Sequence, residues 1–167
     1  MVPSIPRSTF AISIAGMNTT PKNNWLVMAG VLSVAAALLH LAVIVGGAEW
    51  YRFFGAGEGM ARLAERGSLT PHLITLTIAL VLAIWAAYAF AGAGLFPRLP
   101  LMRTALLTIT AIYLLRGLAL FPTLALKPAL VDRFTLWSSI IVLVYGIIYA
   151  VGTWRAWPTL GNRAEPK

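Results

Sequence analysis

The chain has 167 residues, of which 59% are hydrophobic and 11% carry a charge. This composition excludes an ordinary water-soluble domain, and the absence of cysteine excludes disulfides, thiol redox catalysis, iron–sulfur clusters and cysteine-ligated zinc. The net charge is +8, but the basic residues are scattered over predicted loops and tails. That pattern favours contact with anionic lipid over nucleic-acid binding.

Four apolar runs dominate the chain, and each nears or reaches the roughly 20 residues that a helix needs to cross hydrocarbon. They are apolar nearly all round, whereas a soluble surface helix carries one apolar stripe. The runs are Trp25–Val45, Leu73–Leu95, Leu101–Leu120 and Phe134–Val151. We therefore predict an all-α integral membrane protein that folds as an antiparallel four-helix transmembrane bundle.

The predicted transmembrane domain covers residues 25–154, between an N-terminal tail (1–24) and a C-terminal tail (155–167). Met17 begins a short polar segment that leads into the first helix, so we interpret it as an alternative translation start. The helices are predicted at about 25–46, 71–95, 101–121 and 134–154.

The distribution of basic residues predicts the orientation. Seven lysines and arginines fall in the N-terminal tail, the second loop and the C-terminal tail, against five in the first and third loops. Because cytoplasmic segments carry the excess of positive charge, we expect both termini in the cytoplasm. The short loops and the Ala- and Leu-rich spans are typical of small bacterial inner-membrane proteins.

The first helix presents small residues and one histidine along a single face. Gly30, Ser33, Ala37 and His40 follow one another at spacings of three or four residues. Small residues let transmembrane helices approach closely, so this face is predicted to pack inside the bundle and to carry His40 with it. The Gly46-Gly47 pair is predicted to end the helix.

Residues 48–67 are predicted to form an interfacial lid with a short helix. Glu49–Phe54 mixes aromatic and charged side chains, as segments at the headgroup level do. Glu58–Arg66 can form a helix in which Glu58 and Arg62 pair at i,i+4. We expect this lid to lie across the outer mouth of the bundle.

The later helices place further polar residues near the same mouth. Thr70 can cap the second helix and Pro71 suits its first position, which puts His72 in the first turn. The third helix carries Tyr113 and Arg116 on one face. Pro122 is predicted to close that helix, and Trp137 lies one turn into the fourth.

Ionisable groups inside transmembrane spans are rare and usually functional, so this concentration at one end predicts a site. The leading hypothesis is that the site binds an amphipathic ligand, a lipid or quinone, entering from the outer leaflet. Arg116 would bind an anionic or carbonyl group, and His40 would donate a hydrogen bond or transfer a proton. The acid–base candidates are His40, Glu49 and His72, and the ligand-binding candidates are Arg116, Tyr113, Trp137 and Arg52.

Structural roles compete with each of these assignments. Arg116 can extend its long side chain to the headgroups, and His40 can bond a backbone carbonyl or Tyr113 and serve only to hold helices together. His72 can be an ordinary interfacial residue, and Glu49 and Arg52 can simply anchor the lid. At the level of the whole chain, the alternative is a non-catalytic accessory subunit that binds another membrane protein through its small-residue faces. The small size of the chain also suits a homo-oligomer.

Haem b is the one specific cofactor that the sequence suggests, and no other metal site is predicted. His40 and His72 lie on adjacent helices and are candidate axial ligands of one iron. The objection is one of depth, because His72 lies at the mouth while His40 lies about two turns deeper.

Overall fold

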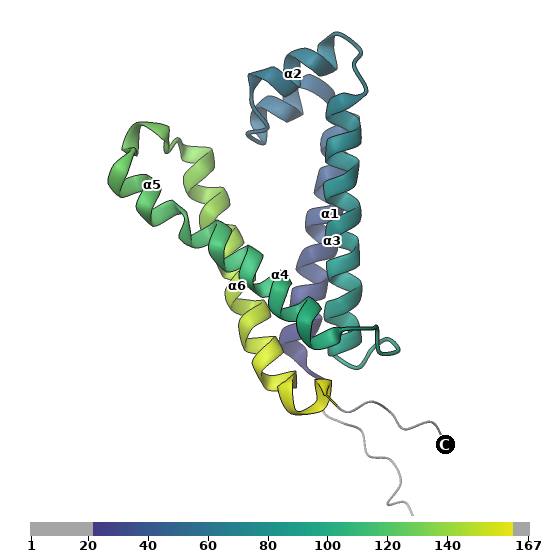
Figure 1. Ribbon diagram of the computed structural model, residues 1–167. Coiled ribbons are helices and arrows are strands. Elements are labelled where there is room, and N and C mark those ends of the chain that lie inside the picture. The colour runs from purple at the N-terminus through teal and green to yellow at the C-terminus, as the bar shows by residue number, and fades with distance from the viewer. Residues whose placement is uncertain (1–21, 162–167) are drawn as a thin grey trace, which may run out of the picture.

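The computed structural model describes residues 22–161, and every element of regular secondary structure in this range is a helix (Figure 1). Within that range, four segments are long and apolar enough to cross a membrane: α1, α3, α4 together with α5, and α6. This confirms the predicted fold class, including the short helix between the first two spans. The elements are α1 (Asn24–Phe53), α2 (Glu58–Glu65), α3 (Thr70–Gly92), α4 (Met102–Leu118), α5 (Leu120–Leu126), the 3-10 turn η2 (Pro128–Leu130) and α6 (Arg133–Leu160).

The four spans are arranged as two helix pairs, α1 with α3 and α4 with α6. The pairs meet where α1 begins and α6 ends, and they diverge toward α2 and α5 (Figure 1). We call these the convergent end and the divergent end. At the convergent end the Asn23 side-chain amide donates to the Gly152 carbonyl over 2.7 Å, which ties the start of α1 to α6. The predicted start at Met17 and the residues after 161 lie outside the described part of the chain.

Two glycines allow α4 and α6 to approach closely. A Cβ on Gly117 would lie 2.7 Å from the Leu143 Cα, and a Cβ on Gly146 would lie 3.0 Å from the Leu114 backbone nitrogen. The distance at Gly117 is shorter than any Cβ tolerates, and the distance at Gly146 is tighter than most Cβ contacts, so glycine at these positions lets the two helices approach closely. This contact fixes which faces of α4 and α6 point toward α1 and α3.

The first helix is longer than the sequence analysis predicted, because the Gly46-Gly47 pair bends it rather than ending it. Gly47 has φ 64° and ψ −149°, after which the helix resumes and continues to Phe53. The last turns bury Tyr51 against Val43 and Ala61. Burial of this large ring favours the continued helix over an open loop.

Other helix ends also differ from the prediction. Pro122 does not close the third span, because it lies in the first turn of α5, where its missing N–H interrupts no helical hydrogen bond. Thr70 is the first residue of α3 rather than its cap, while Pro71 occupies the first turn as predicted. The last span continues beyond 154 to Leu160, with Pro158 inside it.

Candidate functional site

A cluster of aromatic rings, which we call the tyrosine junction, lies where the two helix pairs meet. It consists of Trp85 of α3, Tyr113 of α4, and Tyr145 and Tyr149 of α6. The Tyr113 ring centroid lies 5.0 Å from that of Trp85, 5.6 Å from that of Tyr145 and 5.4 Å from that of Tyr149. Such offset and edge-on pairs stabilise beyond the area they bury. The junction therefore joins three of the four spans.

Hydrogen bonds connect the junction to α1. Tyr149 is 0% exposed, and its hydroxyl lies 2.8 Å from the Ser33 hydroxyl and donates to the Trp85 carbonyl over 3.2 Å. Tyr145 donates to the Leu32 carbonyl, also over 3.2 Å. The Tyr113 hydroxyl is also buried, but among the described residues it has no hydrogen-bond partner. One tyrosine is thus satisfied by protein groups and its neighbour is not.

We expect Tyr149→Phe to destabilise the protein and Tyr113→Phe to leave its stability unchanged or slightly raised. The first change removes the two hydrogen bonds of the Tyr149 hydroxyl, with Ser33 and with the Trp85 carbonyl, which costs about 1–2 kcal/mol. The second removes a hydroxyl that bonds nothing in the described chain. Thermal unfolding in detergent compares the two isosteric variants. A clear loss in Tyr113→Phe would show instead that its hydroxyl has a partner outside the described residues.

His40 lies on the Ser33 face of α1, two turns nearer the divergent end. Seven residues separate the two, and seven residues make about two helical turns. The His40 Nδ1 lies 2.7 Å from the Ala36 carbonyl oxygen of the same helix, and because a carbonyl oxygen only accepts, Nδ1 is the donor. A bond from His40 to a backbone carbonyl is what a purely structural role for this residue predicts. The bond uses Nδ1 and leaves Nε2 for a different partner.

Arg116 lies three residues beyond Tyr113, and therefore on nearly the same face of α4. Its guanidinium Nη1 donates to the Ser139 hydroxyl of α6 over 3.1 Å, and Ser139 is itself only 1% exposed. Arg116 as a whole is exposed, and within residues 22–161 it forms no ion pair. The residue is thus fixed at one atom by a neutral group, while the rest of its guanidinium remains accessible.

The lid is held together by its own ion pairs. Arg52 contacts the Glu58 and Glu65 carboxylates, each at 2.8 Å, and Arg62 contacts Glu58 at 3.0 Å, as predicted for the i,i+4 pair. Hydrogen bonds from Arg52 and then Arg62 lower the pKa of Glu58 to about 2. The Arg52 guanidinium therefore serves α2, which favours its anchoring role over the predicted role in ligand binding.

His72 also packs against the lid. The Tyr51 ring meets the His72 ring edge-on, with centroids 6.1 Å apart, and the His72 Nδ1 lies 3.3 Å from the Ser68 carbonyl oxygen. Tyr51 comes after His40 on α1, beyond the bend at Gly47. His72 is therefore level with a much later part of α1 than His40, and this offset disfavours a haem held by both histidines.

The structure brings only some of the predicted site residues together. Tyr113 and Arg116 lie one turn apart on α4, but no hydrogen bond in the described chain joins either of them to His40. Trp137 is 63% exposed, and Glu49 is also exposed. The proposed His40–Glu49–His72 acid–base group gains no supporting contact.

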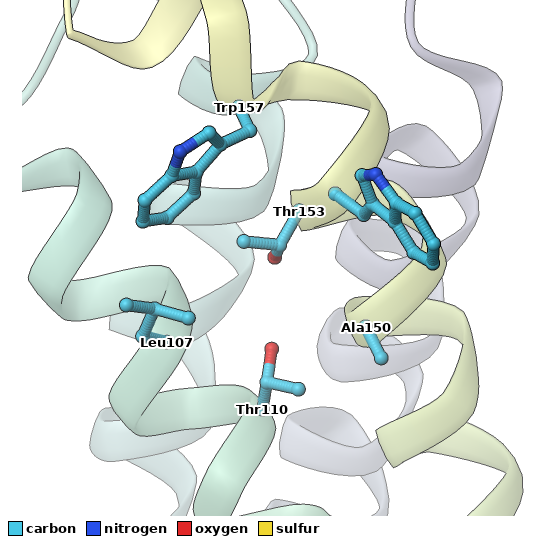
Figure 2. A pocket seen from close by; sticks show the side chains of 6 residues that line it. Leu107, Thr110, Ala150, Thr153 and Trp157 are labelled. Atoms are coloured by element: carbon cyan, nitrogen blue, oxygen red, sulfur yellow. The ribbon is translucent and has the colours of Figure 1, made fainter.

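Two hollows fall outside the predicted site. One is a groove of about 330 Å³ between α4 and α6, lined by Leu107, Thr110, Ala150, Thr153, Trp154 and Trp157. In Figure 2 the Thr110 and Thr153 side chains face each other across it, and the Thr110 hydroxyl donates to the Leu106 carbonyl over 2.7 Å. The Thr153 hydroxyl is buried and has no partner in the described residues. The other is a cavity of about 830 Å³ at the convergent end. Trp154 and Trp157 are the residues whose type could have indicated this groove. In the sequence, however, such a pair is equally typical of an aromatic anchor at the membrane interface.

No family model, curated protein or solved structure matches the chain. Its class therefore follows from the fold alone: four apolar spans in one helical bundle define a multi-pass membrane protein that contacts the lipid bilayer.

Proposed function

We propose that this membrane protein binds an amphipathic ligand, a lipid or quinone, between its two helix pairs on the side of the divergent end. Arg116 would hold the anionic or carbonyl group of the ligand, and the apolar spans would contact its hydrocarbon. The single observation that carries the proposal is an arginine inside an apolar span whose hydrogen bond goes to a serine rather than to a carboxylate of the described chain.

The energetics of Arg116 favour a ligand. A charged side chain within a span is expensive and normally pairs with another polar group. One of its five N–H donors goes to Ser139, and the guanidinium fork matches carboxylate, phosphate and carbonyl oxygens. A ligand that supplies these oxygens would offset the cost of desolvating the Arg116 guanidinium, which the single hydrogen bond to Ser139 does not offset.

The arrangement of the helices favours a ligand between the pairs. The face of α4 that carries Tyr113 and Arg116 packs on α3 at the tyrosine junction, and beyond it the pairs diverge (Figure 1). The α-carbons of α1 and α4 do not come within 8 Å of one another. His40 lies two turns beyond Ser33 on α1, toward the divergent end, as Arg116 lies beyond Tyr113 on α4.

A second candidate function rests on the exposure of Arg116. An exposed arginine on a span also suits the carboxylate of a partner membrane protein, in which case this chain is an accessory subunit. Ligand and partner would satisfy the same guanidinium, so they predict different companions for the purified protein.

The proposal predicts that Arg116→Leu abolishes retention of the ligand. Protein purified in mild detergent is extracted with organic solvent, and the lipids and quinones are quantified per chain. We expect one amphipathic species at a constant ratio in the wild type, at least tenfold less in Arg116→Leu, and partial recovery in Arg116→Lys, which keeps the charge but not the fork. The matched control is Arg133→Gln, a nearby exposed arginine at the start of α6. Equal amounts in wild type and Arg116→Leu, with folding intact, would contradict the proposal.

A further inference from the structure

The convergent end contains a cavity of about 830 Å³ that is separate from the Arg116 region. It lies between the start of α1, the end of α3 with the loop that follows, and the last turns of α6. This volume is within the range of small-molecule sites. All three basic residues that line it, Lys22, Arg98 and Arg155, come from different segments of the chain.

Among the described residues that line the cavity, the charged side chains are all basic. No aspartate or glutamate is among them, and α1 has no acidic residue in its first turn. Lys22 before α1 and Arg155 near the end of α6 therefore raise the local concentration of anions. The cavity is thus suited to a negatively charged group.

The position of Arg155 is set by an aromatic contact. Its guanidinium carbon lies 5.7 Å from the centre of the Trp25 ring, which also lines the cavity. A guanidinium held over an indole face keeps its N–H donors at the edge of the plane, where they bind oxygens in pairs. Trp25 therefore contributes an apolar surface to the cavity, and Arg155 beside it contributes paired N–H donors.

We propose that this cavity binds a phosphate group, carried either by an anionic phospholipid at the membrane surface or by a small phosphorylated solute. Phosphate presents several oxygens to one arginine and to a neighbouring ammonium, and this is the chemistry that Arg155 and Lys22 offer together. The Asn23 amide, which donates to the Gly152 carbonyl, holds the two segments that bear these residues side by side.

The test titrates the full-length protein in neutral detergent with two probes, inorganic phosphate and dioctanoyl phosphatidylglycerol. Binding is followed by tryptophan fluorescence, since Trp25 lines the cavity. We expect saturable binding of at least one probe and a tenfold or greater weakening in Arg155→Gln. Binding of phosphate itself identifies a solute site, whereas binding of phosphatidylglycerol alone identifies a lipid headgroup site.

Two controls separate this site from others. Arg103→Gln makes the same charge change at the same end, at a residue that stacks on Trp157 and does not line the cavity. Arg116→Leu tests independence from the proposed function, whose ligand class includes phosphatidylglycerol. We expect Arg103→Gln to bind both probes as the wild type does, and Arg116→Leu to keep the binding that Arg155→Gln weakens. Failure of the wild type to bind either probe, or equal weakening in Arg103→Gln and Arg155→Gln, would overturn the proposal.

Discussion

Gly117→Val is expected to separate α4 from α6 and to destabilise the protein by about 2–3 kcal/mol. A Cβ at this position would lie 2.7 Å from both the Cα and the Cβ of Leu143, and 2.8 Å from its backbone nitrogen. Because two of these three atoms are backbone, no side-chain rotation relieves the clash, and the helices must move apart. Unfolding of the purified protein in a mixed-detergent titration, followed by circular dichroism, measures the loss.

The effect of Gly117→Val should extend to the tyrosine junction and Arg116. Separation of the two helices would lengthen the contact between Arg116 and Ser139, which spans the same pair. The matched control is Ala111→Val, which adds bulk at an exposed position of the same helix. We expect that variant to unfold like the wild type. Equal stability of Gly117→Val and wild type would show that α4 and α6 do not approach closely at this glycine.

Gly47→Ala is expected to cost about 1–3 kcal/mol or to straighten α1 and displace the lid. With φ 64° and ψ −149°, Gly47 occupies a region of backbone conformation that is essentially restricted to glycine. Nothing lies within 4 Å of the position that a Cβ would take, so the penalty is purely conformational. Hydrogen exchange of α2, together with thermal unfolding, distinguishes lost stability from a displaced lid.

Gly59→Ala serves as the control for the hinge at Gly47. Gly59 lies inside α2 with open space around its Cβ position, so alanine should be neutral or slightly stabilising there. If Gly47→Ala were as stable as Gly59→Ala and kept the same exchange pattern in α2, the bend in α1 would not require glycine.

The four spans could be predicted because their signal is local and large. Each run is apolar over enough residues to cross hydrocarbon, and this property depends on neither partner nor register. The Glu58–Arg62 pair was predictable for the same reason, since i,i+4 spacing alone brings the two side chains together.

Helix ends were predicted less well, because tertiary burial decides them. The Gly46-Gly47 pair is typical of a helix end, but the helix continues beyond it, and this continuation buries Tyr51 against Val43 and Ala61. Pro122 is typical of a helix end, but it lies in the first turn of α5, where its missing N–H removes no helical hydrogen bond. In both places the local residue permits two outcomes, and packing selects one.

The candidate site required contacts that no single helix specifies. The bond from Arg116 to Ser139 depends on the register of α4 against α6, which the Gly117 and Gly146 contacts set. The convergent-end cavity draws Lys22 and Arg155 from opposite ends of the described chain. In the sequence these residues indicated only topology and membrane contact, because nothing in their spacing shows that they share a cavity.

The two proposed sites lie on opposite sides of the tyrosine junction. Arg116 lies near the end of α4 that leads to α5, and Arg155 lies near the end of α6. In Figure 1 the helix pairs diverge toward α5 and converge at the end of α6. The hydrogen bonds of Tyr149 to Ser33 and Trp85 connect α6 to both helices of the other pair. A ligand that changes the angle between the pairs would therefore act on the junction that both sites share.

The most direct test of the central claim is native mass spectrometry of the wild-type protein after gentle extraction from membranes. We expect a single kind of polypeptide that carries an amphipathic molecule of defined mass, and the loss of that mass in Arg116→Leu. A protein free of such a molecule, accompanied by a second polypeptide that dissociates in Arg116→Leu, would contradict the ligand and identify a partner as the group that Arg116 binds.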